Sequence, residues 1–333
     1  MKRGVVSMMS MCVLFVGMIR VSSVHAQEVL GVHLLHPSEI TQAKELLRTE
    51  ENKDQWMYIT IPFVLEDLNR LREWQQFFSL AREYRFKPII RLGTRYNPET
   101  QSWDRPTRKD IVNLVGGIDH LEWPDESDKI VVIFNEPNHA KEWGGKIDAV
   151  GYARTLQFAI DWLVTTDQAY RVLPAGLDLA ASNGRDVTTN LPTAEALEYL
   201  RTMLQAEPRI AETIGGWNSH SYPNPGFSGR PTDTGKLSLR GWESELLVLK
   251  EFSTRDIGVY ITETGWEENN TTRRWIKGYY AYAVDHVWSD PRIQAVTPFV
   301  LNGSPGPFER LSFFDASGKP TLSFDAFRQA LIE

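Results

Sequence analysis

Cysteine is almost absent from this sequence of 333 residues. Its single cysteine, Cys12, lies in an N-terminal stretch that we expect to be removed. The remaining chain would have no thiol, which excludes internal disulfides, cysteine nucleophiles and cysteine metal sites. A phosphate-binding glycine-rich motif is also missing, because the pairs Gly144–Gly145 and Gly215–Gly216 lack the spacing and context of nucleotide loops. We therefore predict no cofactor.

Histidine and basic residues are scarce as well. Among the seven histidines, His139 and His220 are too isolated in sequence for a zinc cluster, so we predict no metal. Without Lys2, Arg3 and Arg20, which belong to the N-terminal stretch, the chain has 33 basic residues against 43 acidic ones. This negative balance argues against nucleic acid as a partner.

The N-terminal stretch, residues 1–26, has the layout of a secretory signal peptide. Lys2 and Arg3 precede an apolar run from Val5 to Ile19, and Ala26 offers a small residue at the cleavage site. We therefore expect export to the periplasm or the medium, with no stable membrane partner after cleavage. The alternative is an uncleaved membrane anchor, for which the apolar run is short.

The remaining chain alternates short β-type runs with amphipathic stretches of helical period, which is typical of βα units around a parallel sheet. Three amphipathic sets are clear: Leu68, Leu71, Trp74, Phe78 and Ala81; Leu156, Ile160 and Leu163; and Trp275, Tyr279, Tyr282 and His286. The eight expected strands are Val29–Leu34, Trp56–Ile61, Lys87–Leu92, Lys129–Phe134, Val172–Leu177, Ile214–Ser219, Gly258–Thr262 and Ala295–Leu301. No linker interrupts them, so we predict one α/β domain, residues 27–333, with the fold of a TIM (β/α)8 barrel. The pattern alone leaves an open doubly wound sheet as the alternative.

Two glutamates directly follow buried strands. Glu136 comes after the run Ile130–Phe134, in the segment NEP, and Glu263 comes after Val259–Thr262, in the segment TETGW. In a closed barrel, the ends of the fourth and seventh strands lie on opposite sides of one mouth, so these carboxylates would face each other. Facing carboxylates are what glycosidic hydrolysis requires, one as proton donor and one at the anomeric carbon. Alternatively, each glutamate belongs to a structural ion pair.

The sixth expected strand ends in an H-x-Y pattern. Alternation puts His220 and Tyr222 on the same side, so both can point into the mouth. A tyrosine hydroxyl that donates to one carboxylate would keep it ionised, which would make one glutamate the nucleophile and the other the acid. A lone histidine is more often a packing residue, but its spacing from the tyrosine favours a place in the site.

Together, these motifs resemble those of clan A glycoside hydrolases, retaining enzymes built on eight-stranded α/β barrels. The resemblance covers the mature chain in the order of its elements, and NEP, H-x-Y and TETGW are its specific parts. It implies that Glu136 is the general acid/base and Glu263 the nucleophile. It also implies that Asn135 donates to the sugar 2-hydroxyl and that Tyr222 hydrogen-bonds to the nucleophile.

The second strand departs from the pattern of family 5. In that family it commonly ends in Arg-x-Pro, whose arginine contacts the nucleophile, whereas this chain has Thr60, Ile61 and Pro62. Arg91, in PIIRLGT on the third strand, could supply the missing charge. Alternatively, it is a buried arginine paired with a barrel carboxylate such as Asp178.

The eighth strand departs too, because many clan members present a tryptophan there and this chain has Phe299, Leu301 and Asn302. The string ETGW resembles the nucleophile stretch of family 17, and NEPN resembles family 39. The motifs therefore indicate the clan without selecting one family.

Four of the 11 tryptophans fall in loops or strand ends on the expected catalytic side, as candidate sugar platforms: Trp103, Trp143, Trp217 and Trp266. Flat aromatic faces favour stacking of this kind. Trp143 and Trp266, which closely follow the two glutamates, are the stronger candidates, although each tryptophan could instead pack a loop. The stretch Tyr222–Leu237, with three prolines and three glycines, is expected to be a long loop that walls a substrate cleft.

The sequence thus predicts an exported, retaining β-glycosidase that hydrolyses O-glycosidic bonds in a polysaccharide or oligosaccharide by double displacement. The alternative is a carbohydrate-binding TIM barrel that has lost catalysis. The sugar and its linkage depend on the shapes of long loops, which composition does not fix.

Overall fold

Eight apolar runs form parallel strands, and each overlaps the stretch that the sequence predicts, although the fifth ends at Pro174 and the eighth already at Val296, three and five residues before the expected ends. The computed structural model describes residues 28–332, so the expected signal peptide, residues 1–26, and Cys12 lie outside it. No helix within 28–332 is long and apolar enough to cross a membrane. The barrel strands are β1 (Gly31–His33), β2 (Met57–Val64), β3 (Phe86–Gly93), β6 (Lys129–Ile133), β7 (Tyr170–Pro174), β10 (Trp217–Ser219), β11 (Val259–Ile261) and β12 (Ile293–Val296).

The strands close into a barrel in the order of the chain. They pair as β1-β2-β3-β6-β7 and as β10-β11-β12, with parallel neighbours throughout. A parallel bridge between Leu30 and Val296 joins β12 to the beginning of β1. A second bridge, between Asp178 and His220, joins the chain after β7 to the chain after β10. These links exclude the open doubly wound sheet.

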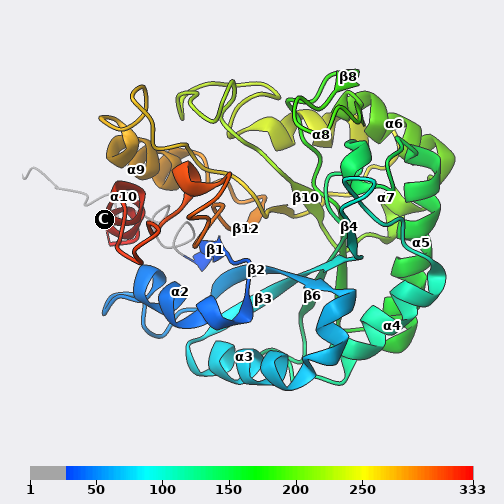
Figure 1. Cartoon of the computed structure of the whole chain (residues 1–333), viewed down its shortest axis with the longest axis horizontal. Coiled ribbons are helices and arrows are strands. Elements are labelled where there is room, and N and C mark those ends of the chain that lie inside the picture. Colours follow the sequence, from blue (N-terminus) through cyan, green and yellow to red (C-terminus); the bar gives the residue numbers. More distant parts are fainter. Residues whose placement is uncertain (1–27, 333) are drawn as a thin grey trace, which may run out of the picture.

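Helices surround the barrel, one main helix after each barrel strand (Figure 1). They are α2 (Ile40–Leu47), α3 (Leu71–Glu83), α4 (Arg108–Asp119), α5 (Ala149–Thr166), α6 (Ala196–Ala206), α8 (Gly241–Leu249), α9 (Ile276–His286) and α10 (Leu322–Ala330), with the short α7 (Ile210–Thr213) after α6. Short 3-10 helices are η1 (Pro37–Glu39), η2 (Leu65–Asn69), η3 (Ala140–Glu142) and η4 (Glu309–Leu311). Two small hairpins lie in the loops after β3 and β7. They are β4 (Tyr96–Asn97) with β5 (Ser102–Trp103), and β8 (Gly184–Arg185) with β9 (Pro192–Thr193).

Two cores result from the alternation along the strands. In β6, Ile130 and Val132 point into the barrel, whereas Val131 and Ile133 belong to the larger core between strands and helices. The interior cluster consists of Ile89, Ile130, Val132, Leu173, Tyr260 and Ala295. Both faces of β6 are therefore buried, as an unbroken apolar strand requires.

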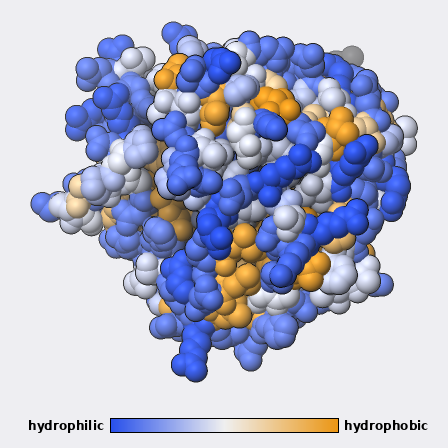
Figure 2. All heavy atoms as spheres, turned by 45° about the vertical axis from the view of Figure 1, so that its right-hand side comes forward, coloured by the Kyte–Doolittle hydropathy of each residue, from blue (hydrophilic) through white to orange (hydrophobic). Residues whose placement is uncertain are grey.

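The helical period is confirmed for α5 and for Trp74, Phe78 and Ala81 of α3, whereas Leu68 lies in η2, and the face of α9 is corrected. Leu156, Ile160 and Leu163 of α5 are buried. In α9, Trp275 is 51% exposed, and the buried face is the neighbouring stripe of Ile276, Tyr280, Ala283 and Val284. That stripe has the i, i+4, i+7, i+8 spacing of a core-facing surface. Figure 2 shows the result on one face, where polar residues dominate and apolar ones gather in hollows between them.

Candidate active site

The chain leaves β6 through a sharp turn that presents Glu136 at the mouth of the barrel. Phe134 and Glu136 both have positive φ values, 68° and 26°, a conformation that side-chain-bearing residues adopt infrequently. The turn is held from below, because Trp143 packs edge-on against Phe134 with ring centroids 5.9 Å apart. Residues held in such conformations cluster at functional sites, where surrounding packing sustains the strain.

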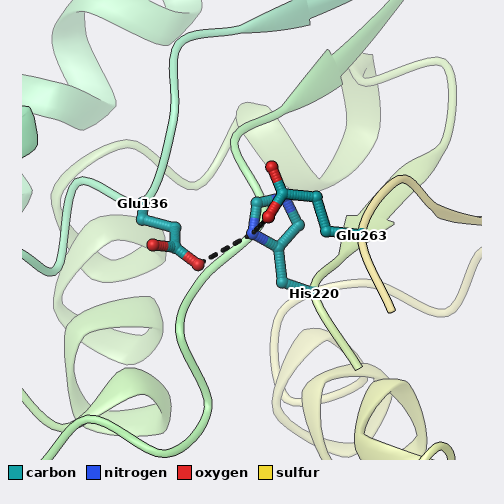
Figure 3. A group of neighbouring side chains, drawn as sticks. All are labelled: Glu136, His220 and Glu263. Atoms are coloured by element: carbon teal, nitrogen blue, oxygen red, sulfur yellow. Dashed lines mark hydrogen bonds and ion pairs between the residues drawn. The ribbon is translucent and has the colours of Figure 1, made fainter. Parts of the chain in front are cut away.

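Glu136 faces Glu263 across the mouth, with His220 between them (Figure 3). His220 Nδ1 lies 2.9 Å from Glu136 Oε1 and 3.7 Å from Glu263 Oε2. One oxygen of each glutamate and one nitrogen of His220 all lie within 4.8 Å of one another. The structure therefore brings together the two predicted carboxylates and the predicted histidine.

Glu263 sits in the more crowded surroundings of the two glutamates. Tyr222 donates its hydroxyl to Glu263 Oε2 at 3.2 Å, and Arg91 Nη1 donates to Glu263 Oε1. His33, from the end of β1, places Nδ1 3.8 Å from the same Oε1. Glu263 itself is only 8% exposed. Its carboxylate is thus enclosed by donors, whereas the carboxylate of Glu136 contacts His220 and is more open to the pocket.

These contacts favour an ionised Glu263. Burial alone would raise the pKa of Glu263, but the nearby charges of His220 and Arg91, together with the hydrogen bond from Arg91, hold it below its usual range. Burial likewise opposes the charge of His220, yet Glu263 and the hydrogen bond to Glu136 raise the pKa of the imidazole. Burial, with Arg91 nearby, lowers the pKa of His33 to about 3, so His33 is neutral. An ionised, enclosed carboxylate is suited to act as a nucleophile.

Arg91 supplies the charge that the second strand lacks. Its Nη1 also donates to Asn135 Oδ1 at 2.8 Å, so one guanidinium nitrogen joins the candidate nucleophile to Asn135. The alternative partner, Asp178, instead accepts from His139 Nε2 at 2.8 Å, so that reading of Arg91 is wrong. Arg91 engages the side-chain oxygen of Asn135, whose amide nitrogen carries two N–H groups. Glu142 is the hydrogen-bond partner of one of them, so the other is left for a ligand.

A pocket of about 780 Å³ opens over the two glutamates. Trp103, half-buried, lines it, as do aromatic residues from the loop after β12, Phe299 and Phe308. The expected long loop, Tyr222–Leu237, has no regular structure and contributes Tyr222 and Phe227 to the wall. The pocket is large enough for more than one sugar ring, since ligand sites of about 300 to 1,000 Å³ hold drug-sized molecules.

Three of the four tryptophans predicted as platforms are core residues instead. Trp143, Trp217 and Trp266 are each 1% exposed and do not line the pocket. Trp143 packs on Phe134 below the turn, and Trp266 packs on Tyr280 with ring centroids 5.1 Å apart. A buried ring cannot stack on a sugar, so the interpretation as platforms is wrong for these three. Trp143 and Trp266 lie close to the two glutamates in sequence because they pack behind the strand ends that carry them.

Several residues of the site were not expected from the sequence. His33 lies next to Glu263, and His139, Lys141 and Glu142 follow Glu136 in the chain and line the pocket. Burial and the charge of Glu136 raise the pKa of Glu142 to about 7. A histidine inside the apolar run GVHLLH was a usable signal for His33, because a polar side chain within a buried strand requires a partner.

Glu136, His220 and Glu263 also offer the donor atoms of a small cation site. The surroundings oppose that use, because the Arg91 guanidinium lies against the same Glu263 carboxylate and would repel a cation. His220 Nδ1 is already within hydrogen-bond distance of Glu136. We therefore interpret the three residues as a hydrogen-bonded group and not as a cation site.

Comparison with models of protein families gives no match for this sequence, and comparison with curated protein sequences gives none either. Solved structures do resemble it. A family 39 β-xylosidase from Caulobacter crescentus superposes with a TM-score of 0.59 and 15% identity over 90% of this chain and 70% of that one. An endo-β-1,4-glucanase from Xanthomonas axonopodis pv. citri gives 0.57 and 14%, over 91% and 98% of the two chains. The chain has the fold of clan A glycoside hydrolases.

A third solved structure has the same fold. A family 128 endo-β-1,3-glucanase from Pseudomonas viridiflava superposes with a TM-score of 0.54 and 12% identity, over 90% of this chain and 96% of that one. The resemblance inferred from NEP, H-x-Y and TETGW is therefore confirmed at the level of the fold. Identities this low carry the fold alone, so the activity rests on the site itself.

Proposed function

We propose that this protein is a retaining β-glycosidase acting on a polysaccharide or oligosaccharide. The observation that carries the proposal is the pair Glu136 and Glu263, whose closest oxygens lie within 4.8 Å at the mouth of the barrel. Retaining glycosidases place their carboxyl groups about 5 to 5.5 Å apart, and inverting ones about 6.5 to 9.5 Å. The short separation supports a double displacement, in which the second carboxylate itself attacks the anomeric carbon.

The two carboxyl groups take different parts in the first step. Glu263, ionised by its partners, attacks the anomeric carbon while the bond to the leaving oxygen breaks, and Glu136 gives its proton to that oxygen. The product of this step is a glycosyl ester of Glu263. In the second step Glu136 takes a proton from water, the resulting hydroxide attacks the anomeric carbon, and the carboxylate of Glu263 leaves.

Neighbouring side chains divide the work around the reacting sugar. Asn135, fixed by Arg91 through its oxygen, has an amide N–H for the sugar 2-hydroxyl. Tyr222 and Arg91 hold the carboxylate of Glu263, which limits its motion before attack. Trp103 is the one predicted platform that the pocket exposes. Donors already placed in the ground state lower the cost of reorganisation in the transition state.

The substrate classes to test come from the similar structures. The names of those proteins include a β-xylosidase, an endo-β-1,4-glucanase and an endo-β-1,3-glucanase, so β-linked xylans and glucans are the first candidates. We propose a neutral β-glycan of this kind as the substrate. Export through the expected signal peptide is part of the proposal, and mass spectrometry of secreted protein should find an N-terminus at Gln27.

The decisive experiment incubates the purified protein with β-1,4-glucan, β-1,3-glucan, xylan, mannan and aryl β-glycosides. Product should form with at least one, and proton NMR should show the β-anomer first. A 2-deoxy-2-fluoro glycoside of the active sugar should label a peptide containing Glu263. Lys53→Met, which changes an exposed residue distant from the pocket, is the control. Tight binding of a glycan without product, unchanged in Glu263→Gln, would instead establish the inactive sugar-binding barrel.

A further inference from the structure

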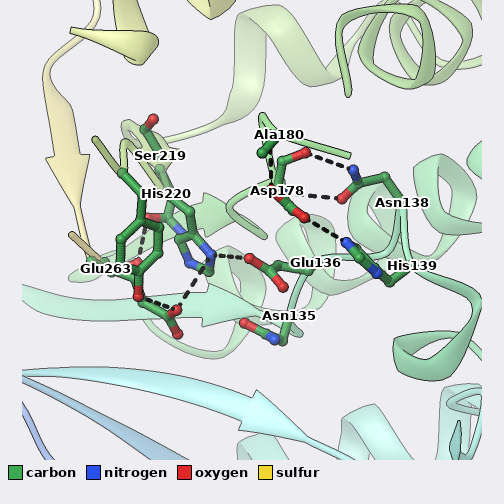
Figure 4. A network of polar contacts seen from close by, with 12 residues as sticks. Asn135, Glu136, Asn138, His139, Asp178, Ala180, Ser219, His220 and Glu263 are labelled. Carbon is green, nitrogen blue, oxygen red and sulfur yellow. Dashed lines mark hydrogen bonds and ion pairs between the residues drawn. The ribbon is translucent and has the colours of Figure 1, made fainter. Parts of the chain in front are cut away.

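A group of charged side chains lies in the same pocket, beside Glu136 and away from Glu263. We call His139, Lys141, Asp178 and Asp186 the outer charged cluster. His139 Nε2 donates to Asp178 Oδ2 at 2.8 Å, and Lys141 Nζ donates to Asp186 Oδ2 at 3.3 Å. In Figure 4, Glu136 lies between His220 on one side and the His139–Asp178 pair on the other. All four residues line the pocket.

The outer charged cluster is held by a rigid frame. The buried Asn138 donates to the carbonyl of Ala194 at 3.2 Å, which ties the segment after Glu136 to the β8–β9 hairpin. At the tip of the hairpin, Asp186 Oδ1 accepts the backbone N–H groups of Thr188 and Thr189 at 2.9 and 2.8 Å. Because Oδ1 is held by these two N–H groups, the carboxylate is fixed, and its second oxygen, Oδ2, faces Lys141 and His139.

One polar atom in this frame has no partner within residues 28–332. His139 is 8% exposed, and its Nδ1 makes no hydrogen bond. Asp186 Oδ2 lies 3.9 Å from that nitrogen, too far for a direct bond. A hydroxyl oxygen placed about 2.8 Å from both atoms would satisfy the nitrogen and donate to the carboxylate. Buried polar atoms without partners are uncommon, so the gap points to a ligand hydroxyl.

The charges within the outer charged cluster favour a neutral ligand. Two carboxylates, Asp178 and Asp186, stand beside Lys141 and His139. Burial opposes charge on His139, but Asp178 and Glu136 raise its pKa above the usual value. Burial would raise the pKa of Asp186, but the backbone N–H groups of Thr189 and Thr188 and the charge of Lys141 lower it to about 2. Within the cluster two carboxylates offset two cationic groups, and the carboxyl groups of Glu136 and Glu142 lie near Lys141 as well, so hydroxyl groups fit better than an anion.

The position of Glu136 identifies the part of the substrate that would reach this place. The sugar that becomes bonded to Glu263 lies beside Asn135 and Tyr222, and Glu136 protonates the oxygen that leaves. The leaving group then extends past Glu136, toward His139. We propose that the outer charged cluster is the binding subsite for the leaving sugar, which makes oligosaccharides and polysaccharides the preferred substrates over glycosides with apolar leaving groups. This inference rests on the proposed glycosidase activity.

The test compares two leaving groups in Lys141→Met and Asp186→Asn. The second variant keeps an oxygen for the N–H groups of Thr188 and Thr189. The substrates are cello-, laminari- and xylo-oligosaccharides and the 4-nitrophenyl β-glycosides of one to three of the same sugars. Losing a hydrogen bond to a charged group should lower kcat/KM for the oligosaccharide by about tenfold or more. For the 4-nitrophenyl glycoside, kcat/KM should fall several-fold less than for the oligosaccharide, because that leaving group makes no such hydrogen bond.

A second readout uses the same subsite in reverse. When a sugar replaces water as acceptor, it must bind where the leaving sugar was. Cellobiose or xylobiose as acceptor should give less transglycosylation product in Lys141→Met than in the wild-type protein, relative to hydrolysis. Methanol, which needs no subsite, should give the same share of methyl glycoside in both. Lys53→Met serves as the matched lysine control because it lies outside the pocket.

The outcomes separate the two proposals. If wild-type protein hydrolyses neither class of substrate, the glycosidase activity itself fails. If it is active but kcat/KM falls equally on both substrate classes in both variants, the residues only support the fold or the catalytic pair, and the subsite is refuted. Unchanged ratios of oligosaccharide to aryl glycoside, with unchanged acceptor use, would refute it as well.

Discussion

Removing the cation beside the candidate nucleophile is the most direct test of how the site works. Arg91 Nη1 donates to both Glu263 and Asn135, and the side chains of Arg91 and Glu263 are only 13% and 10% exposed. Arg91→Met keeps most of the aliphatic volume and deletes the charge. The variant therefore leaves a buried carboxylate whose remaining polar neighbours are Tyr222, His220 and the neutral His33.

The structure sets the size of the expected change. A neighbouring arginine lowers the pKa of a carboxyl group by about 1 to 3 units. Two charges 4 Å apart at an effective dielectric constant of about 20 interact by about 4 kcal/mol, which corresponds to the upper end of that range. Catalysis requires ionised Glu263, so the acidic limb of the kcat/KM profile should move to higher pH by about 1 to 3 units in Arg91→Met.

The same substitution has a definite sign in folding stability. Because the pKa of Glu263 is lower in the folded chain than in the unfolded one, its ionisation stabilises the fold above the unfolded value. That contribution is lost as the pH falls toward the folded pKa. Urea unfolding of Arg91→Met should thus show its greatest loss of stability near neutral pH and a shrinking loss below about pH 4.

Matched variants separate the charge from general damage. Arg91→Lys keeps a cation and should leave the acidic limb near its original pH, although kcat should fall because a lysine presents no planar fork. Arg95→Met removes an exposed arginine that pairs with Glu66 and should change neither profile. An acidic limb that stays in place in Arg91→Met would refute the role of Arg91 in keeping Glu263 ionised.

Four further outcomes can be checked with single preparations. Tyr222→Phe should lower kcat/KM by about 10- to 100-fold, measured on the best glycan, because a hydrogen bond to a buried carboxylate is lost. Glu136→Gln should abolish the alkaline limb of the pH profile, and azide should restore turnover of an aryl glycoside by replacing water; a surviving alkaline limb would contradict its role as acid. Burial raises the pKa of Glu245 to about 7, so its ionisation destabilises the wild-type fold as the pH rises from about 5 to 8. The loss should be about 3 kcal/mol in urea unfolding, and Glu245→Gln should remove it. A chelator should leave hydrolysis unchanged, since side chains supply both the proton and the nucleophile, and loss of activity restored by a divalent ion would point to a metal-dependent hydrolase.

The barrel could be predicted because its physical signal is repeated along the chain. Each strand must bury both faces, so runs such as Ile130–Phe134 stand out from the amphipathic helices between them. The candidate catalytic pair followed from the same logic, since groups directly after strands share one face of a barrel. Strand ends shifted by a few residues, because short apolar runs continue into the turns, as they do at Phe134 after β6.

The tryptophans could not be assigned in the same way. Sequence position places Trp143 and Trp266 at the catalytic end of the barrel, but it does not tell whether a side chain turns toward the pocket or toward the core. The outer charged cluster was inaccessible for another reason. Asp186 is far from Lys141 in the chain, and only the β8–β9 hairpin, held by Asn138, brings the two together.

Arg91 shows how the site keeps its electrostatics while departing from the family 5 pattern. In the register of β2 and β3, Pro62 lies beside Arg91, and Thr60, where that pattern places arginine, lies beside Ile89. The Thr60 hydroxyl instead meets that of Thr297 at 2.7 Å, so a pair of small side chains occupies the barrel there. An arginine one strand further on, and two residues nearer the mouth, then reaches Glu263 directly. The cation therefore lies against the candidate nucleophile although a different strand carries it.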